Sequence, residues 1–180
     1  MRRAHQRGNL LTPIALDTIR PRPLHLTPRL LTVASFVRPT DRLLDIGTDH
    51  ARLPVYLMQR GLCTAATAAD IAEGPLARAA RTVKTHMLDE KITLIQSDGG
   101  SGLDPTAYDT VTITGMGGDT ISAILEKSPW LWEKRLILQP QTRVSRFEEM
   151  VGRTAAQKIT VSEGHRKYHI FFYEGAKCSQ

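Results

Sequence analysis

The most chemically suggestive residues of this chain lie at the end of an apolar run. Asp45, Gly47, Asp49 and His50 fall within six consecutive positions there. A GxGxxG phosphate cradle counted from Gly47 would need glycine at positions 49 and 52, which hold Asp49 and Arg52. A carboxylate about 4 Å from a pyrophosphate costs several kcal/mol at an effective dielectric near 20. The turn therefore favours a cationic ligand without phosphate, and helix capping is the alternative role for its acids.

Further positions suited to ligand binding follow the later apolar runs. Asp70 lies 23 residues after Gly47, a spacing that suits an acid hydrogen-bonded to the two hydroxyls of a ribose. Asp98 and Gly99 follow the third run, at a position that can meet an adenine edge. Residues 115–118, Gly-Met-Gly-Gly, follow the fourth run, and the three glycines, which lack side chains, let a ligand approach the backbone. Because ligands of open α/β sheets bind at the carboxyl ends of the strands, we expect these residues to share one edge.

Alternating strands and helices must position these residues. The predicted strands span residues 43–47, 64–70, 92–95, 110–114, 135–139, 158–162 and 168–173. The predicted helices begin at Thr27, Arg52, Pro75, Asp119 and, with its side chain as the cap, Thr142. This alternation predicts an α/β fold, a doubly wound Rossmann-like sheet with helices on both faces. A short turn joins the last two of the seven strands, so we expect an antiparallel last strand, unlike the six parallel strands of dinucleotide dehydrogenases.

The excess positive charge is confined to the N-terminal part of the chain. The 180 residues carry a net charge of +6; residues 1–40 hold seven basic residues and one acid, whereas residues 41–180 hold 17 of each. Prolines disfavour continuous helix near the start, so we expect a basic, flexible arm at 1–26 and one domain over 27–180. Such an arm attracts polyanions such as nucleic acid or an anionic membrane surface, and a solvated tail is its alternative role.

Cysteine usage and hydropathy indicate the cellular compartment and which partners to expect. Cys63 and Cys178 lie too far apart for a zinc motif or a disulfide framework, so we expect reduced thiols in a cytoplasmic protein. His50, His165 and His169 are too scattered for a metal site. No apolar run approaches the roughly 20 residues of a membrane span. We therefore expect neither a metal nor a membrane as a partner.

Six segments resemble the bacterial tRNA (adenine-22-N1)-methyltransferase family, in the same order and with similar spacing. They are LTVASFV, DIGTDHARLP, ADIAEGP, SDGGSGL, TGMGGDTI and LILQPQ. The resemblance covers about residues 27–174. It implies the class I methyltransferase fold, S-adenosylmethionine as the cofactor, tRNA as the partner, and methylation of the ring nitrogen N1 of an adenine. Members of the family continue into a C-terminal helical domain, which this chain, ending at Gln180, is expected to lack.

Carried over by position, the resemblance implies a set of cofactor contacts. They are Asp45, Gly47, Asp49, His50, Asp70, Asp98, Gly99, Gly115 and Met116. Two positions depart from the family pattern, because Arg52 stands where a tyrosine is usual and Gln141 where an asparagine is usual.

The chemistry of the expected reaction suggests one catalytic candidate. Methyl transfer moves positive charge toward the base, and a nearby carboxylate would stabilise that charge. Asp119, just after the glycine segment, is the candidate, with a helix N-cap as its alternative role. Two other functions stay open: a class I methyltransferase acting on a small molecule or a protein, and a non-catalytic cofactor-binding subunit.

Overall fold

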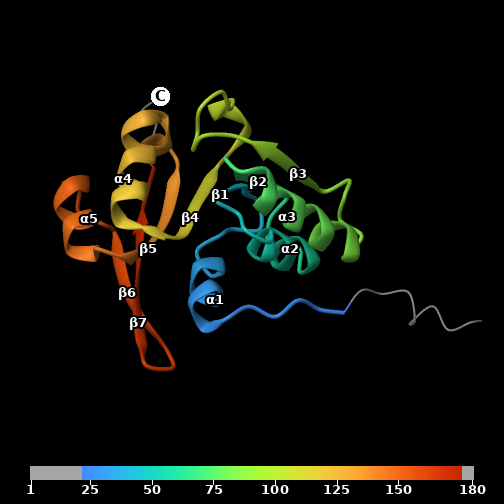
Figure 1. Ribbon diagram of the computed structural model, residues 1–180, viewed down its shortest axis with the longest axis horizontal. Coiled ribbons are helices and arrows are strands. Elements are labelled where there is room, and N and C mark those ends of the chain that lie inside the picture. The colour runs from blue at the N-terminus through green and yellow to red at the C-terminus, as the bar shows by residue number, and fades with distance from the viewer. Residues whose placement is uncertain (1–21, 176–180) are drawn as a thin grey trace, which may run out of the picture.

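The computed structural model describes residues 22–175 as a seven-stranded sheet with helices on both faces (Figure 1). The strand order is β3-β2-β1-β4-β5-β7-β6. Strands β1 to β5 pair in parallel, and β7 is antiparallel to both of its neighbours, β5 and β6. The predicted doubly wound α/β sheet with an antiparallel last strand is therefore confirmed.

The elements follow the predicted order along the chain. The strands are β1 (Arg42–Ile46), β2 (Ala65–Asp70), β3 (Ile92–Gln96), β4 (Thr110–Gly117), β5 (Arg135–Thr142), β6 (Gln157–Glu163) and β7 (Arg166–Tyr173). The α-helices are α1 (Pro28–Ala34), α2 (Arg52–Gln59), α3 (Glu73–Thr85), α4 (Gly118–Lys127) and α5 (Val144–Val151). Two 3-10 turns, η2 (Pro105–Ala107) and η3 (Pro129–Glu133), precede β4 and β5.

Several predicted bounds differ from the structure by a few residues, and two of the differences bear on the residues near the site. Strand β4 does not end at Thr114, because its pairing with β5 continues to Gly117 through a register irregularity at Gly115, whose φ is +79°. The prediction that Thr142 caps the next helix is wrong. Thr142 is the last residue of β5, and the N-cap of α5 is Arg143, whose backbone is left-handed.

The sheet separates two hydrophobic clusters, one on each face. Helices α1, α2 and α3 cover one face, and α4, η3 and α5 cover the other. Because successive side chains of a strand point to opposite faces, Ile137 of β5 packs with the first cluster while its neighbours Leu136 and Leu138 pack with the second. All three are fully buried. Consecutive apolar residues of this kind are expected in a strand that is covered on both faces.

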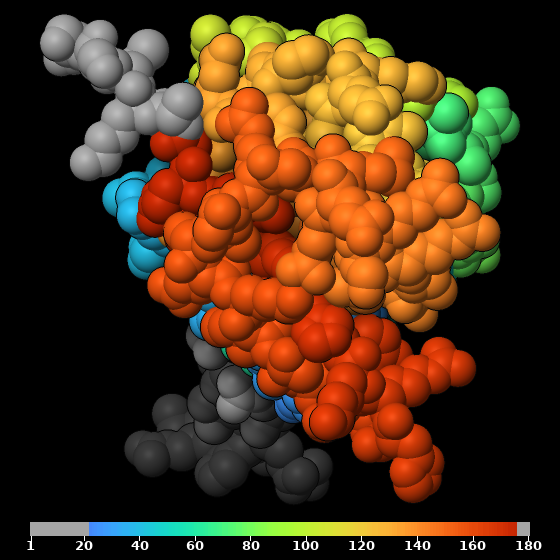
Figure 2. All heavy atoms as spheres, turned by 90° about the vertical axis from the view of Figure 1, so that its left-hand side faces the viewer, coloured from blue at the N-terminus to red at the C-terminus, as the bar shows by residue number. Residues whose placement is uncertain are grey.

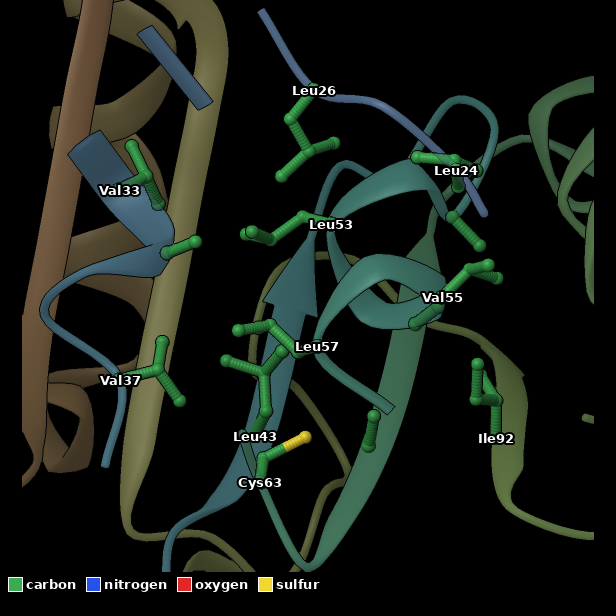
Figure 3. Packing of buried hydrophobic residues seen from close by; sticks show 14 of the residues in the cluster. Leu24, Leu26, Val33, Val37, Leu43, Leu53, Val55, Leu57, Cys63 and Ile92 are labelled. Carbon is green, nitrogen blue, oxygen red and sulfur yellow. The ribbon is translucent and has the colours of Figure 1, made fainter. Parts of the chain in front are cut away.

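The described chain begins against helix α2. Leu24 and Leu26 are 8% and 9% exposed, and they lie beside α2 near Leu53 (Figure 3). The backbone N–H of Leu24 donates to Gln59 Oε1 at 2.9 Å. The last residues of the predicted arm therefore pack on the domain, whereas residues 1–21 lie outside the described part of the chain.

Candidate functional site

A cavity of about 270 Å³ opens where the strand order reverses. Strand β1 pairs with β2 on one side and with β4 on the other, so the chain leaving β1 and the chain leaving β4 diverge at their carboxyl ends. Side chains of α1 close a third side. The lining consists of Arg29, Leu30, Asp45, Gly47, Thr48, Asp49, His50, Ala51, Arg52, Leu53, Thr114, Gly115 and Met116. This is the place where open α/β sheets bind ligands.

Six of the nine predicted cofactor residues line this cavity. They are Asp45, Gly47, Asp49, His50, Gly115 and Met116. Asp70, Asp98 and Gly99 follow the neighbouring strands β2 and β3, as predicted, but are not part of the lining.

The three residues outside the lining have contacts of their own. Asp70 Oδ1 accepts the N–H of Ala72 at 2.9 Å, which shapes the turn after β2. Asp98 is paired with Lys127 Nζ at 2.8 Å. A Cβ on Gly99 would lie 2.9 Å from a methyl carbon of Ile124, so this glycine lets α4 pack closely. These contacts give Gly99 a packing role that the sequence spacing did not reveal.

Asp45 is the buried charge of the cavity. Its side chain is 6% exposed, and Oδ1 accepts a hydrogen bond from the Thr112 hydroxyl at 2.7 Å. Burial raises the pKa of Asp45 from 3.8 to about 6, against the opposing effect of hydrogen bonds from Thr112 and Thr48, and the charge of Asp70 raises it further. Above that pH the cavity holds a desolvated carboxylate, which a cation placed beside it would stabilise.

Gly47 forms a turn that admits no side chain. Its φ is +76°, a left-handed conformation that glycine adopts without strain. A Cβ added at Gly47 would lie 1.8 Å from Met116 Cε, because the Met116 side chain from β4 crosses directly over this turn. The backbone N–H of Gly47 also donates to Ala69 O at 2.8 Å, which ties the turn to β2.

Asp49 is exposed and already paired. Its carboxylate accepts from the Arg78 guanidinium of α3, with Nε at 2.8 Å, and lies 3.2 Å from His50 Nε2. The N-cap of α2 is Ala51, without a side-chain cap bond, so the alternative helix-capping role of Asp49 is wrong. Arg78 compensates the charge of Asp49, and the preference for a cation therefore rests on Asp45 more than on Asp49.

A buried glutamine frames the wall of the cavity, and the sequence patterns did not single it out. Gln139 of β5 is fully buried, and its Oε1 accepts both the N–H of Gly115 at 3.1 Å and the guanidinium of Arg29. The Arg29 guanidinium also lies over the Tyr168 ring, 5.2 Å from its centroid, and the backbone N–H of Arg29 donates to Glu163 Oε1 at 2.6 Å. Helix α1 is thereby joined to the cavity wall and to the β6–β7 hairpin.

Asp119 has a role that neither sequence interpretation foresaw. It lies in the first turn of α4, but the N-cap of that helix is Gly117, so the capping alternative is wrong. Its carboxylate forms ion pairs with Arg143, the N-cap of α5, and with Nε of Arg146 in α5, at 3.3 Å. Asp119 is not part of the cavity lining, and its catalytic role stays a prediction.

Two negative findings apply to residues 22–175. No group of three or more His, Cys, Asp or Glu side chains converges there in a way that could hold a metal ion. No helix in the same range has the length and apolar character needed to cross a bilayer.

Comparisons with known proteins agree on one family. The model described as "Methyltransferase domain" matches residues 26–171. The tRNA (adenine(22)-N(1))-methyltransferase of Bacillus subtilis is 38% identical over 156 residues, which make up 84% of this chain and 66% of that enzyme. The chain thus spans slightly less than two thirds of the length of this relative.

Solved structures with related sequences have the same architecture. Sp1610 of Streptococcus pneumoniae, in complex with S-adenosyl-L-methionine, has a TM-score of 0.78 and 34% identity, covering 87% of this chain and 76% of its own. M. capricolum TrmK, in complex with S-adenosyl-homocysteine, has a TM-score of 0.73 and 28% identity, covering 84% of this chain and 70% of its own.

Proposed function

Because this chain belongs to the methyltransferase domain family and is 38% identical to the B. subtilis tRNA (adenine(22)-N(1))-methyltransferase, we propose that it methylates N1 of an adenine in tRNA with S-adenosylmethionine. The observation that carries this proposal is the buried carboxylate of Asp45 in a cavity at the strand-order reversal. A desolvated anion suits a cofactor that carries a sulfonium and an ammonium, and it disfavours a pyrophosphate.

A second feature of the cavity fits this cofactor: two backbone turns in its lining carry no side chain. Gly47 and Gly115 both have left-handed backbones and leave the lining without Cβ atoms at two positions. Asp45, Asp49, His50 and Met116 would contact the cofactor from the lining, and Asp70, Asp98 and Gly99 would do so from the ends of β2 and β3. When bound, S-adenosylmethionine supplies an electrophilic methyl group on a positively charged sulfur.

The acceptor requires little proton chemistry from the protein. N1 of neutral adenine already carries a lone pair, so no proton has to leave before the nitrogen attacks. The contribution of the chain is to align the nitrogen with the methyl group, which is worth up to about 7–11 kcal/mol in well-oriented systems. Gln139 serves this alignment because it fixes the Gly115 backbone in the cavity wall.

We also propose that the basic residues of the predicted arm, 1–26, contact tRNA phosphates. Arg2, Arg3 and Arg7 contribute to the net charge of +6 held by residues 1–40. Each phosphate contact that is lost should make the salt dependence of binding less steep. Replacing these three arginines by glutamine should therefore weaken tRNA binding and flatten its dependence on salt, without changing cofactor affinity.

The decisive experiment is mass spectrometry of nucleosides from unmodified tRNA after incubation with the protein and S-adenosylmethionine. We expect 1-methyladenosine to accumulate with wild-type protein and much more slowly with Asp45→Asn. Asp89→Asn is the matched control, since Asp89 is exposed in the turn before β3, away from the carboxyl ends of the strands.

Calorimetry separates the alternatives. Tight binding of S-adenosylhomocysteine without methylation of tRNA would favour another acceptor or a non-catalytic subunit. Tight binding of NAD⁺ together with indifference to S-adenosylhomocysteine would overturn the proposal.

A further inference from the structure

A second cavity, of about 440 Å³, adjoins the first. Gly115 of β4 is part of both linings, so the two spaces meet at this residue. Apart from Gly115 and Gly117 of β4, the second cavity is lined by the end of β5, where Gln141 and Thr142 lie, and by the start of β7, where Arg166, Lys167 and Tyr168 lie. None of these five residues is part of the first lining.

We propose that the second cavity takes the acceptor adenine and that Gln141 determines its specificity by reading the N6/N7 edge of the base. This inference rests on the function proposed above. The amide oxygen of glutamine accepts from the adenine N6 amino group while its amide nitrogen donates to N7, a pairing that recognises adenine over the other bases. Guanine presents two acceptors, O6 and N7, on the same edge and cannot satisfy the amide oxygen.

The geometry of adenine makes this edge the useful one to read. N7 and N1 lie on different edges of adenine, one on each side of the N6 amino group, which has two hydrogens. A glutamine that holds N7 and one hydrogen of N6 therefore leaves the N1 lone pair free to face the first cavity. Recognition of the N1 side itself would occupy the nitrogen that must react.

The two glutamines that flank Pro140 have different partners, and only one is available to a ligand. Gln139 is fully buried, and its amide already bonds Gly115, Arg29 and, at 2.9 Å, Pro140 O. Gln141 is exposed, and no hydrogen bond of its side chain is found within residues 22–175. Its Oε1 would lie 3.7 Å from a Cβ on Gly115, so the free amide stands next to the residue shared by both cavities.

The remaining lining suits a nucleotide rather than an isolated base. Tyr168 offers an aromatic ring on which a base can stack, and Arg29 lies over that ring, 5.2 Å from its centroid. Arg166 and Lys167 add two cations at the start of β7, where phosphates of the same strand can be neutralised. They belong to the β6–β7 hairpin, whose end projects from the body of the protein (Figures 1 and 2).

The test is a double-mutant cycle between protein and base. Kinetics are measured for tRNA whose target adenosine is intact or replaced by 7-deazaadenosine, which has a C–H in place of N7. For wild-type protein we expect the replacement to lower kcat/KM by roughly 2- to 12-fold, the effect of one hydrogen bond. For Gln141→Leu we expect a loss of about 5- to 150-fold with intact tRNA, at 1.4 kcal/mol per tenfold, and no further loss with 7-deazaadenosine.

Two further variants make the cycle specific. Gln141→Asn carries the same amide and should recover part of the activity and of the sensitivity to 7-deazaadenosine. Lys167→Ala should weaken tRNA binding and reduce its salt slope by about 1, while the 7-deazaadenosine effect stays as in wild type. Gln141→Leu should also bind S-adenosylhomocysteine as tightly as wild type, which separates the lost contact from misfolding.

The outcomes distinguish this inference from the proposed function. If wild-type protein forms 1-methyladenosine but 7-deazaadenosine costs wild type and Gln141→Leu the same factor, Gln141 does not read N7 and the inference fails alone. If wild-type protein transfers no methyl group to adenine in tRNA, the proposed function fails and this inference with it.

Discussion

Replacing Asp45 by asparagine should make the ligand-free protein more stable at neutral pH. Burial raises the pKa of this carboxyl from 3.8 to about 6, and a shift of about 2 units corresponds to ~3 kcal/mol between the two protonation states. Asparagine has nearly the same shape, and its Oδ1 can still accept the hydrogen bond from Thr112. Since no charge has to be desolvated in the variant, we expect the free energy of unfolding to rise by up to about 3 kcal/mol at pH 8.

The sign of the pH dependence makes this prediction specific. Because the pKa of Asp45 is higher in the folded protein than in the unfolded chain, the folded protein binds this proton more tightly. The contribution of Asp45 to stability is therefore largest below pH 4 and is lost as the pH rises through about 6. Wild type and Asp45→Asn should be equally stable near pH 4 and should diverge as the pH approaches neutrality.

Thermal and urea unfolding between pH 4 and pH 8 would measure the difference. For a domain of this size 1 kcal/mol corresponds to about 2–4 °C in Tm, so we expect a gap of roughly 6–12 °C at pH 8. Asp89→Asn removes an exposed charge and should show no such gap. An Asp45→Asn variant that is no more stable than wild type at pH 8, or equally stabilised at pH 4, would refute the assignment of a buried, desolvated charge. The same variant should bind S-adenosylmethionine more weakly, because the cation loses its partner.

Three other substitutions test the walls of the first cavity. Gly47→Ala should cost about 1–2 kcal/mol of folding free energy because the backbone there is left-handed, and urea unfolding measures this loss. The same variant should weaken cofactor binding in calorimetry, because the Met116 side chain must move to make room for the added methyl group. Gln139→Leu leaves the N–H of Gly115 without its partner, so we expect a loss of about 1–3 kcal/mol in urea unfolding and a lower kcat. Asp119→Asn should change stability by about 1 kcal/mol or less, because the two arginines that pair with Asp119 are largely exposed; the predicted catalytic role requires kcat to fall at unchanged cofactor affinity, and an unchanged kcat would exclude it.

The sheet was predictable because its evidence is local in sequence. Apolar runs alternate with helical patterns along the chain, and the short turn after β6 indicated the antiparallel β7. The gathering of Asp45, Gly47 and Gly115 at one edge followed from the parallel arrangement of β1 and β4. These inferences need only the side-chain period and the direction of each strand.

The partners of the site residues were not predictable, because they come from distant positions. Arg29 and Gln139 are 110 residues apart, and neither stands in a motif that suggests the other. Arg78 is 29 residues from Asp49, and its contact depends on how α3 packs beside the turn after β1. The raised pKa of Asp45 likewise depends on burial, which the sequence alone does not quantify.

Gly115 is part of the wall of both cavities, and it has no side chain. The main chain at this shared residue is held in place by Gln139, which accepts the Gly115 N–H. If the two spaces hold the methyl donor and the acceptor base as proposed, main chain lies where the two meet, and the choice of acceptor would rest on side chains such as Gln141 and Tyr168. Such an arrangement would let substitutions on β5 and β7 change the acceptor while the cavity at the end of β1 stays intact.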